Sequence, residues 1–163
     1  MAEAIIRPIT LADLPAALAL QAEGYPEALW DGEAAFVSRM VVAPDWCWAL
    51  ERDCRLEGYL LSHPWASFSP PTPDTVLDRA EGDVWYIHDL STARHARGRG
   101  VGGALLAACE AAHPAIRRSE LVAVAGATPY WSRMGWRPAM TEAIAGQVAK
   151  YGPAAIYMAR NWD

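Results

Sequence analysis

The sequence Arg-Gly-Arg-Gly-Val-Gly-Gly at residues Arg97–Gly103 stands between an apolar run, Val84–Leu90, and an apolar helical pattern, Val101–Ala112. Glycines let the backbone come close to a ligand, and the first turn of a helix presents unpaired N–H groups and a partial positive charge. The two arginines add fixed cations that suit the oxygens of a phosphate. The stretch therefore predicts a loop that holds a pyrophosphate group at the start of a helix.

Two other interpretations of this loop are weaker. Gly98, Gly100 and Gly103 match the G-x-G-x-x-G pattern of dinucleotide-binding folds, and Glu120 follows at a distance that suits a ribose-binding acid. In those folds the first glycine directly follows a strand, whereas here the polar stretch Ser91–Ala96 intervenes. The chain after Gly103 is also too short to complete a doubly wound sheet. An ordinary turn before a helix does not need so many glycines and arginines.

Read together with its flanks, the loop resembles motif A of the GNAT family of N-acetyltransferases. That motif has Arg or Gln, two residues, Gly, one residue, and Gly or Ala, and Arg97, Gly100 and Gly102 fill it here. The preceding segment Tyr86–Leu90 is similar to the family's fourth strand. Downstream, Pro129–Trp136 resembles motif B, which is usually Phe-Tyr-x-x-x-Gly-Phe. The resemblance covers nearly the whole chain.

The resemblance implies one α/β domain of the GNAT fold over residues 1–163. That fold is a mixed central sheet of about six to seven strands flanked by about four helices, and it splays between strands four and five. The family uses acetyl-coenzyme A as its acyl donor. The residues that would hold this donor are Leu90, Ser91, Thr92, Arg97, Gly98, Arg99, Gly100, Val101, Gly102, Gly103 and Trp131.

Apolar patterns and turn residues predict the secondary structure along the chain. Thr10 and Asp31 are expected to cap the first two helices, and Asp53-Cys54 is expected to form the turn of a hairpin. The expected strands are 4–9, 46–52, 55–63, 83–92, 120–125, one that starts at Trp136, and 154–159. The expected later helices are 101–113 and 128–134. Residues 64–82 are expected to be irregular.

The composition narrows the class of protein. The 163 residues are 53% hydrophobic and 20% charged, which is enough for a packed core. The net charge of −5 disfavours a nucleic-acid partner, because the protein's field repels phosphates. The three cysteines form no C-x-x-C pair, no signal-peptide pattern starts the chain, and no apolar run is long enough to span a membrane. We expect a cytoplasmic monomer or homodimer that binds no membrane and no metal.

Amide formation from a thioester needs a donor for the oxyanion, a base for the amine and an exit for the thiolate. His88 is the candidate base, because the ordinary pKa of histidine is about 6.5. Strand alternation predicts that His88, Leu90 and Tyr86 share one face and that Asp89 faces the other way. The resemblance implies that a backbone N–H at Leu90 or its neighbour binds the acetyl carbonyl. The alternative is a His88 that only hydrogen-bonds to the loop above it.

The fourth strand also resembles that of arylalkylamine N-acetyltransferases, which reads His-Leu-His-Ala-Leu-Ala-Val. His88 matches the second histidine, whereas Tyr86 replaces the first and puts a two-histidine proton relay in doubt. In motif B, Trp131 stands where the family has a tyrosine that is a proposed acid for the leaving thiolate. An indole N–H is no useful acid. Tyr130, one residue earlier, is the alternative candidate for that acid.

The acceptor is expected to be a primary amine on a small molecule, with aromatic or hydrophobic amines as one option, attacking directly in a ternary complex. The candidate substrate contacts are Tyr25 and Trp30, and the other aromatic residues near the expected pocket are Trp65, Phe68 and Trp85. The acids that would hold an ammonium group are Glu23, Glu27 and Asp31. The alternatives are a protein or peptide N-acetyltransferase and a non-catalytic sensor that binds acyl-coenzyme A.

Overall fold

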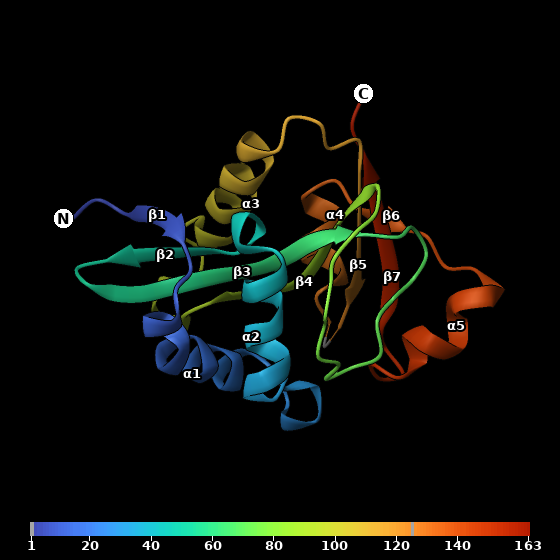
Figure 1. The fold of residues 1–163 in the computed structure, drawn as a ribbon, viewed down its shortest axis with the longest axis horizontal. Helices are drawn as coiled ribbons and strands as arrows, with labels where there is room; N and C mark the ends of the chain where they lie inside the picture. Colours follow the sequence, from blue (N-terminus) through green and yellow to red (C-terminus); the bar gives the residue numbers. More distant parts are fainter. Residues whose placement is uncertain (1, 125) are drawn as a thin grey trace.

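The computed structural model of the protein describes residues 2–124 and 126–163. Its centre is a seven-stranded sheet with the order β1-β2-β3-β4-β5-β7-β6 (Figure 1). Neighbouring strands are antiparallel except β4 and β5, which are parallel. The strands are β1 (Ile5–Pro8), β2 (Trp48–Arg52), β3 (Arg55–Trp65), β4 (Val84–Thr92), β5 (Arg118–Ala123), β6 (Arg137–Pro138) and β7 (Ile156–Asn161). The predicted mixed α/β sheet is confirmed.

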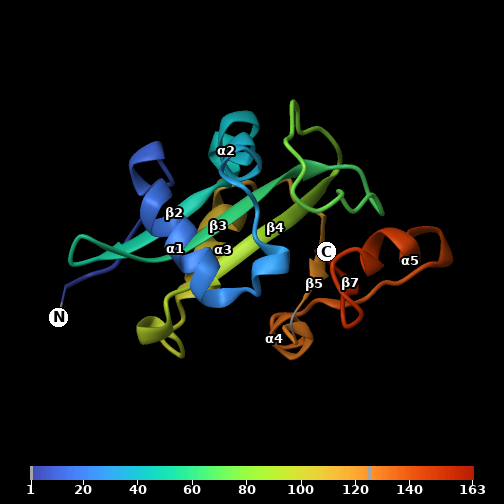
Figure 2. The same cartoon turned by 90° about the horizontal axis from the view of Figure 1, so that it is seen from below.

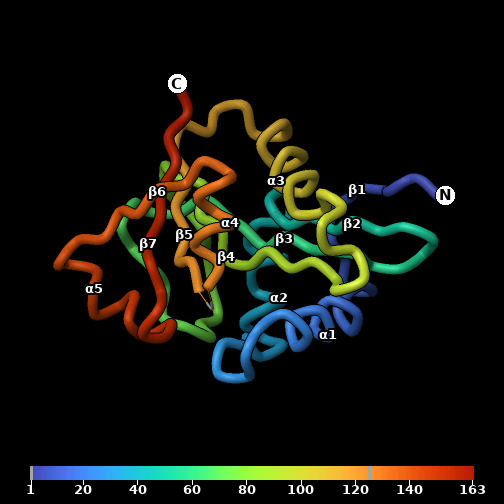
Figure 3. Tube along the Cα trace, turned by 180° about the vertical axis from the view of Figure 1, so that it is seen from behind, coloured from blue at the N-terminus to red at the C-terminus, as the bar shows by residue number. Residues whose placement is uncertain are grey.

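Helices cover both faces of this sheet. They are α1 (Leu14–Gly24), α2 (Glu33–Val42), α3 (Val101–Ala112), α4 (Thr128–Arg133) and α5 (Glu142–Ala149). Alternation along β3 sets the faces, because Gly58 and Ser62 contact α3 while Tyr59 packs edge-on against Phe36 of α2. From behind, the chain can be followed from β1 at one edge of the sheet to β6 and β7 at the other (Figure 3). Within the described ranges, no helix is long and apolar enough to cross a bilayer.

Local structure agrees with the sequence prediction at the turn between β2 and β3 and differs from it at α2 and α5. Asp53 and Cys54 form the hairpin turn, with φ values of 52° and 60° that two non-glycine residues rarely adopt. Asp31 does not cap α2, because the helix begins at Glu33 with Gly32 before it. The sequence prediction also missed α5, which buries only Ile144 and Val148 in its eight residues and so has a weak apolar stripe. The expected strand end at Ala125 lies outside the described residues.

The sheet opens between β4 and β5. In the described chain their parallel pairing joins Trp85–Ile87 to Ser119–Leu121 and then ends, although β4 continues to Thr92. The two strands diverge beyond that point, and the edge of β4 toward β5 loses its strand partner (Figure 2). The splay that the resemblance implied is therefore present, and it exposes backbone N–H and C=O groups in the middle of the molecule.

A β-bulge sits at the same place in β4. Leu61 of β3 pairs with Asp89 and Ser62 pairs with Ile87, so His88 has no partner residue along β3. An extra residue of this kind re-aims the side chains around it and interrupts the alternation of the strand. The position of the bulge is therefore what decides the direction of each side chain in this part of β4.

The bulge overturns two predictions. His88 contacts Asp31, which precedes α2, and Asp89 accepts a hydrogen bond from Tyr59, so both point to the side of α1 and α2. Leu90 instead points to α3, where its side chain lies 3.4 Å from the place that a Cβ on Gly102 would occupy. The prediction that His88 and Leu90 share a face is wrong, and so is the prediction that Asp89 faces away from His88. Both assumed regular alternation along the strand, which the bulge interrupts.

The long irregular segment after β3 is anchored by Glu120 of β5. The buried carboxylate of Glu120 accepts hydrogen bonds from the Ser67 hydroxyl, from the Phe68 N–H at 2.6 Å, from the Tyr157 hydroxyl at 2.5 Å and from Arg118 Nε at 2.6 Å. Burial raises the pKa of Glu120, but these donors outweigh burial and hold the pKa below its ordinary value. The segment is thus tied to the sheet by one ionised side chain.

Glu120→Gln is expected to lower the free energy of unfolding by about 3 kcal/mol, because a neutral amide replaces the fully buried carboxylate that accepts from Arg118 and three other donors. Since the pKa of Glu120 is lowered in the folded state, its stabilisation is present above the ordinary value of 4.5 and is lost as the pH falls through the folded pKa. Urea denaturation from about pH 6 to about pH 3 should show a steeper loss for the wild type than for the variant. Glu142→Gln, at an exposed site in α5, is the control. Parallel curves for wild type and Glu120→Gln would contradict the assignment.

Candidate active site

A groove of about 680 Å³ lies where β4 and β5 diverge, between β4, the start of α3, and α4. Ten of the eleven residues predicted to hold the donor line it, and they are Leu90, Ser91, Thr92, Arg97, Gly98, Gly100, Val101, Gly102, Gly103 and Trp131. Sequence reasoning missed Arg133 and Met134, which α4 and the residue after it bring to the opposite wall. The structure thus gathers residues from three separate segments along one channel.

The glycine loop adopts the close backbone approach that its sequence predicts. Gly98 and Gly100 have φ values of 76° and 77°, a left-handed conformation that strains other residues. A Cβ on Gly102 would lie 2.5 Å from the hydroxyl of Tyr130, so a larger residue here would force Tyr130 to shift. No side chain of the described residues caps α3. The first N–H groups of this helix therefore remain available at the groove, where they form a site for an anion.

The two arginines of the loop point to different places. Arg97 lines the groove, and Arg133 adds a second cation from the opposite wall. The guanidinium of Arg99 lies 3.7 Å from the buried carboxylate of Glu57, which also pairs with Arg52 at 2.7 Å. Arg97 and Arg133 are consequently the side-chain cations that the structure places along the groove walls.

A second pocket of about 70 Å³ adjoins the groove, since Tyr25, Leu90 and Trp131 line both. It lies toward α1 and α2 and contains both predicted strand residues, Tyr86 and His88. Its walls also include residues that the sequence did not single out for this pocket, namely Leu29, Pro73, Leu121, Val122 and Tyr151. The bulged strand β4 therefore presents different residues to two connected spaces.

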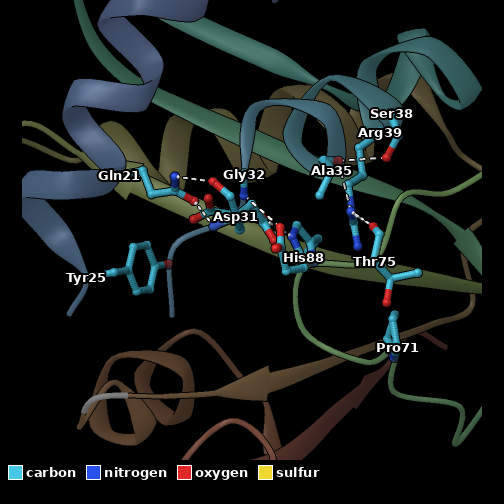
Figure 4. A network of polar contacts seen from close by, with 12 residues as sticks. Gln21, Tyr25, Asp31, Gly32, Ala35, Ser38, Arg39, Pro71, Thr75 and His88 are labelled. Carbon is cyan, nitrogen blue, oxygen red and sulfur yellow. Dashed lines mark hydrogen bonds and ion pairs between the residues drawn. The ribbon is translucent and has the colours of Figure 1, made fainter. Parts of the chain in front are cut away.

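His88 forms a short contact inside the second pocket. Its Nε2 lies 2.6 Å from Oδ2 of Asp31, and the side chains are only 6% and 8% exposed (Figure 4). Burial raises the pKa of Asp31, but His88 and the nearby charge of Arg39 outweigh burial and lower it below its ordinary value. Asp31 is therefore ionised, and of the three acids proposed to hold an ammonium group it is the one that lines this pocket.

The backbone of Leu90 faces the opening between the strands. The Ala93 N–H donates to the Glu57 carbonyl of β3 at 2.8 Å. Because backbone groups alternate sides along a strand, the N–H and C=O of Leu90 point away from β3 and toward β5. The Tyr25 hydroxyl donates to the Leu90 carbonyl at 3.2 Å, which agrees with that direction. The N–H of Leu90 is therefore directed at the junction of the groove and the pocket.

Two tyrosine hydroxyls near the groove, that of the acid candidate Tyr130 and that of Tyr25, differ in their surroundings. The hydroxyl of Tyr130 is buried against Gly102 and has no hydrogen-bond partner in residues 2–124 and 126–163. Burial raises the pKa of Tyr130, and burial with the neighbouring Asp89 raises the pKa of Tyr25 well above its ordinary value. Both phenols are therefore protonated, but Tyr25 is the one whose hydroxyl contacts Leu90 at the junction.

The other candidates for the acceptor side lie elsewhere. Trp30 Nε1 donates to the Tyr25 carbonyl at 2.7 Å, and Trp30 is 38% exposed. Trp85 lies in the core against Trp136 and Trp162. Glu23 accepts a hydrogen bond from the Arg94 N–H. The remaining three, Glu27, Trp65 and Phe68, are absent from the described lining of the pocket. Among the aromatic residues that the sequence proposed as contacts for the acceptor, Tyr25 is the one in the described lining of the pocket.

Three solved structures illustrate how widely this fold is shared. The first is the GphF GNAT-like decarboxylase in complex with isobutyryl-CoA, at a TM-score of 0.77 and 18% identity, over 96% of this chain and 98% of that one. The ribosomal-protein-S18-alanine N-acetyltransferase from Escherichia coli matches at 0.67 and 16% identity, over 98% and 94%. N-acetylglutamate synthase from Neisseria gonorrhoeae, complexed with coenzyme A and N-acetyl-glutamate, matches at 0.72 and 18% identity, over 100% of this chain and 36% of that one. At these identities the similarity shows the fold alone.

A search of curated protein sequences finds no match. A family model does match, over residues 22–136, which includes β4, the glycine loop with α3, and α4. The model's description is acetyltransferase (GNAT) family, and the matched stretch is more than half of the chain. The splayed strands and the helix N-terminus at the groove lie inside the same stretch. The chain belongs to the GNAT acetyltransferase family.

Proposed function

We propose that this protein transfers the acetyl group of acetyl-coenzyme A to the primary amine of a small molecule, in one direct step within a ternary complex. The observation that carries this proposal is the junction at Leu90. There the large groove, which has cationic walls, meets a small pocket that contains His88. A thioester at the end of the groove and an amine in the pocket would approach each other at this point.

The groove fits the chemistry of coenzyme A. Unpaired N–H groups at the start of α3 and the charge of Arg97 suit its pyrophosphate, and Arg133 adds a cation on the other wall. Ser91 and Thr92 continue along the edge of β4 that faces the gap, where the pantetheine arm would run. Structures of the same fold hold coenzyme A or isobutyryl-CoA, which supports the assignment of the groove to the donor.

The residues at the junction supply each part of acetyl transfer. The Leu90 N–H would donate to the thioester carbonyl oxygen as negative charge develops on it. The attacking amine forms the new C–N bond while the C–S bond breaks, and its proton passes to His88. Tyr25 would give its proton to the leaving thiolate, and the phenolate would recover a proton from water. In this proposal, Tyr130 packs against Gly102 and transfers no proton in the reaction.

The pocket favours a small acceptor over a peptide. Its volume is about a tenth of that of the groove, and aromatic side chains of Tyr25, Tyr86, Trp131 and Tyr151 form much of its wall. Asp31 and His88 provide the polar side that a primary amine needs. The E. coli protein with this fold acts on a ribosomal protein and GphF is a decarboxylase, so peptides and a carboxylated acyl-coenzyme A belong in the test beside small amines.

The test is release of coenzyme A thiol from acetyl-coenzyme A over a panel of small amines and short peptides. We expect thiol release with small amines, and His88→Gln should lower turnover by about 10²–10⁴-fold, because a positioned base contributes that much. Acetyl-coenzyme A affinity, measured by calorimetry, should stay nearly unchanged in the variant. Release only with peptides would favour a protein acetyltransferase. Binding without release by any acceptor would favour a sensor, and carbon dioxide from a carboxylated acyl-coenzyme A would favour a decarboxylase.

Tyr25→Phe and Tyr130→Phe form a matched pair that tests the proton donor. Tyr25→Phe should lower turnover by about tenfold or more, toward the lower end of general acid catalysis because a thiolate is a good leaving group. Tyr130→Phe removes a buried hydroxyl without a partner in the described chain, so it should keep most of the turnover and leave stability nearly unchanged. Steady-state kinetics at saturating donor compare the two. Equal losses in both variants, or full turnover in Tyr25→Phe, would reject Tyr25 as the acid.

A further inference from the structure

The imidazole of His88 has one nitrogen engaged and one open. Nε2 lies 2.6 Å from Oδ2 of Asp31. Nδ1 makes no hydrogen bond within residues 2–124 and 126–163, yet it is not one of the buried side-chain atoms without a partner. His88 lines the acceptor pocket, and its side chain is 6% exposed. Nδ1 is therefore the ring nitrogen that a molecule in the pocket can reach.

The loop between α1 and α2 holds Asp31 in place (Figure 4). The side-chain amide of Gln21 donates to the Asp31 carbonyl at 3.1 Å and accepts from the Asp31 N–H at 2.9 Å, and both contacts are buried. On the other side, the Gly32 N–H donates to Oδ1 of Asp74 at 2.7 Å. These hydrogen bonds hold the backbone of Asp31, and breaking them would leave buried polar groups unpaired, which is costly. The position from which the Asp31 side chain extends to His88 is therefore built into the fold.

The charge of this carboxylate decides where the imidazole proton lies. Arg39 of α2 is fully buried, and its Nη1 donates to the carbonyls of Ala35 at 2.9 Å and Thr75 at 2.5 Å, which fixes a positive charge near Asp31. An ionised carboxylate only accepts hydrogen bonds, so Nε2 of His88 must be the donor. In the neutral ring the lone pair is then on Nδ1.

The neighbouring acid does not compete for the ring. Asp89 follows His88 in the bulge, but its carboxylate accepts from the Tyr59 hydroxyl at 2.5 Å and from Ser91 at 3.3 Å. Burial raises the pKa of Asp89, whereas that of Asp31 is lowered. Asp31 is thus the acid that this site keeps ionised and directs at the imidazole.

We infer that Asp31 is a positioning residue for His88, and that the base of the reaction is Nδ1. This inference rests on the proposed acetyl transfer and names the atom that takes the proton. As the amine nitrogen forms its bond to the acetyl carbon and the C–S bond breaks, the proton of that nitrogen moves to Nδ1. The resulting imidazolium is compensated by the Asp31 carboxylate at Nε2, and it returns its proton to water after the product leaves.

Nitrogen-15 NMR of histidine-labelled protein tests the tautomer directly. The chain has four histidines, and His88→Gln identifies the signals of His88. At a pH where the ring is neutral, we expect the proton on Nε2 and not on Nδ1. Asp31→Asn should remove this preference, since an amide both donates and accepts. A wild-type ring protonated on Nδ1, or an unchanged tautomer in Asp31→Asn, would overturn the inference.

A double-mutant cycle tests whether Asp31 acts through His88. Asp31→Asn should lower turnover by about 10²–10⁴-fold, in the range seen when an orienting aspartate is replaced. In a His88→Gln background the same change should cost little, because residues that act as a unit are not additive. A purely structural Asp31 would cost the same factor in both backgrounds. Asp74→Asn is the control, since it removes a charge from the other side of Gly32 and keeps an acceptor oxygen.

Failure of the proposed acetyl transfer and failure of the role of Asp31 give different experimental results. If the wild type releases no thiol with any amine, the proposed function is rejected, while the NMR experiment still decides the Asp31–His88 geometry. If thiol is released but the cycle is additive, the proposed function stands and the role of Asp31 is rejected. Circular dichroism checks that Asp31→Asn is folded before its turnover is compared with that of the wild type. The tautomer of the wild-type ring decides the inference even where that variant does not fold.

Discussion

The structure depends on the point where β4 stops pairing with β5. Three residues of β4, Trp85–Ile87, hold the two halves of the sheet together, and the next residue is the bulged His88. Continued pairing would bury the backbone of Leu90 between two strands and close the groove. Because pairing ends there, the backbone groups of Leu90 face an opening that the start of α3 and α4 can border. Both spaces of the candidate site follow from that single interruption.

Because of the bulge, His88 and Leu90 of β4 point to opposite faces of the sheet. Without it, strict alternation would send His88 and Leu90 to the same side. With it, Leu90 packs toward α3 and the donor groove, while His88 turns to the loop before α2. A donor and an acceptor can then be bound from opposite sides of one strand and still meet at its backbone. The loop that carries Asp31 closes the acceptor side, and Gln21 fixes that loop through buried hydrogen bonds.

The sequence predicted best those features that depend on residues close to one another along the chain. The glycines of Arg97–Gly103 predict the conformation they adopt, since left-handed residues and a close approach to α4 leave few alternatives. Order and type of most strands also followed from their apolar patterns. The bulge could not be predicted, because one extra residue leaves no mark in a strand that is buried on both faces. The partner of His88 was missed for a related reason: Asp31 is 57 positions away and reads as a helix cap. Arg99 looks equivalent to Arg97 in sequence, but only tertiary structure brings Glu57 to it.

The most direct measurement is a crystal structure of the protein with acetyl-coenzyme A. We expect the pyrophosphate at the N–H groups that begin α3, with Arg97 beside it, and the pantetheine arm along Ser91 and Thr92. We also expect the thioester carbonyl oxygen within hydrogen-bond distance of the Leu90 N–H, with the acetyl group facing His88. Coenzyme A bound elsewhere, or a thioester that points away from Leu90 and the small pocket, would contradict the central claim that the opening between β4 and β5 is the site of transfer.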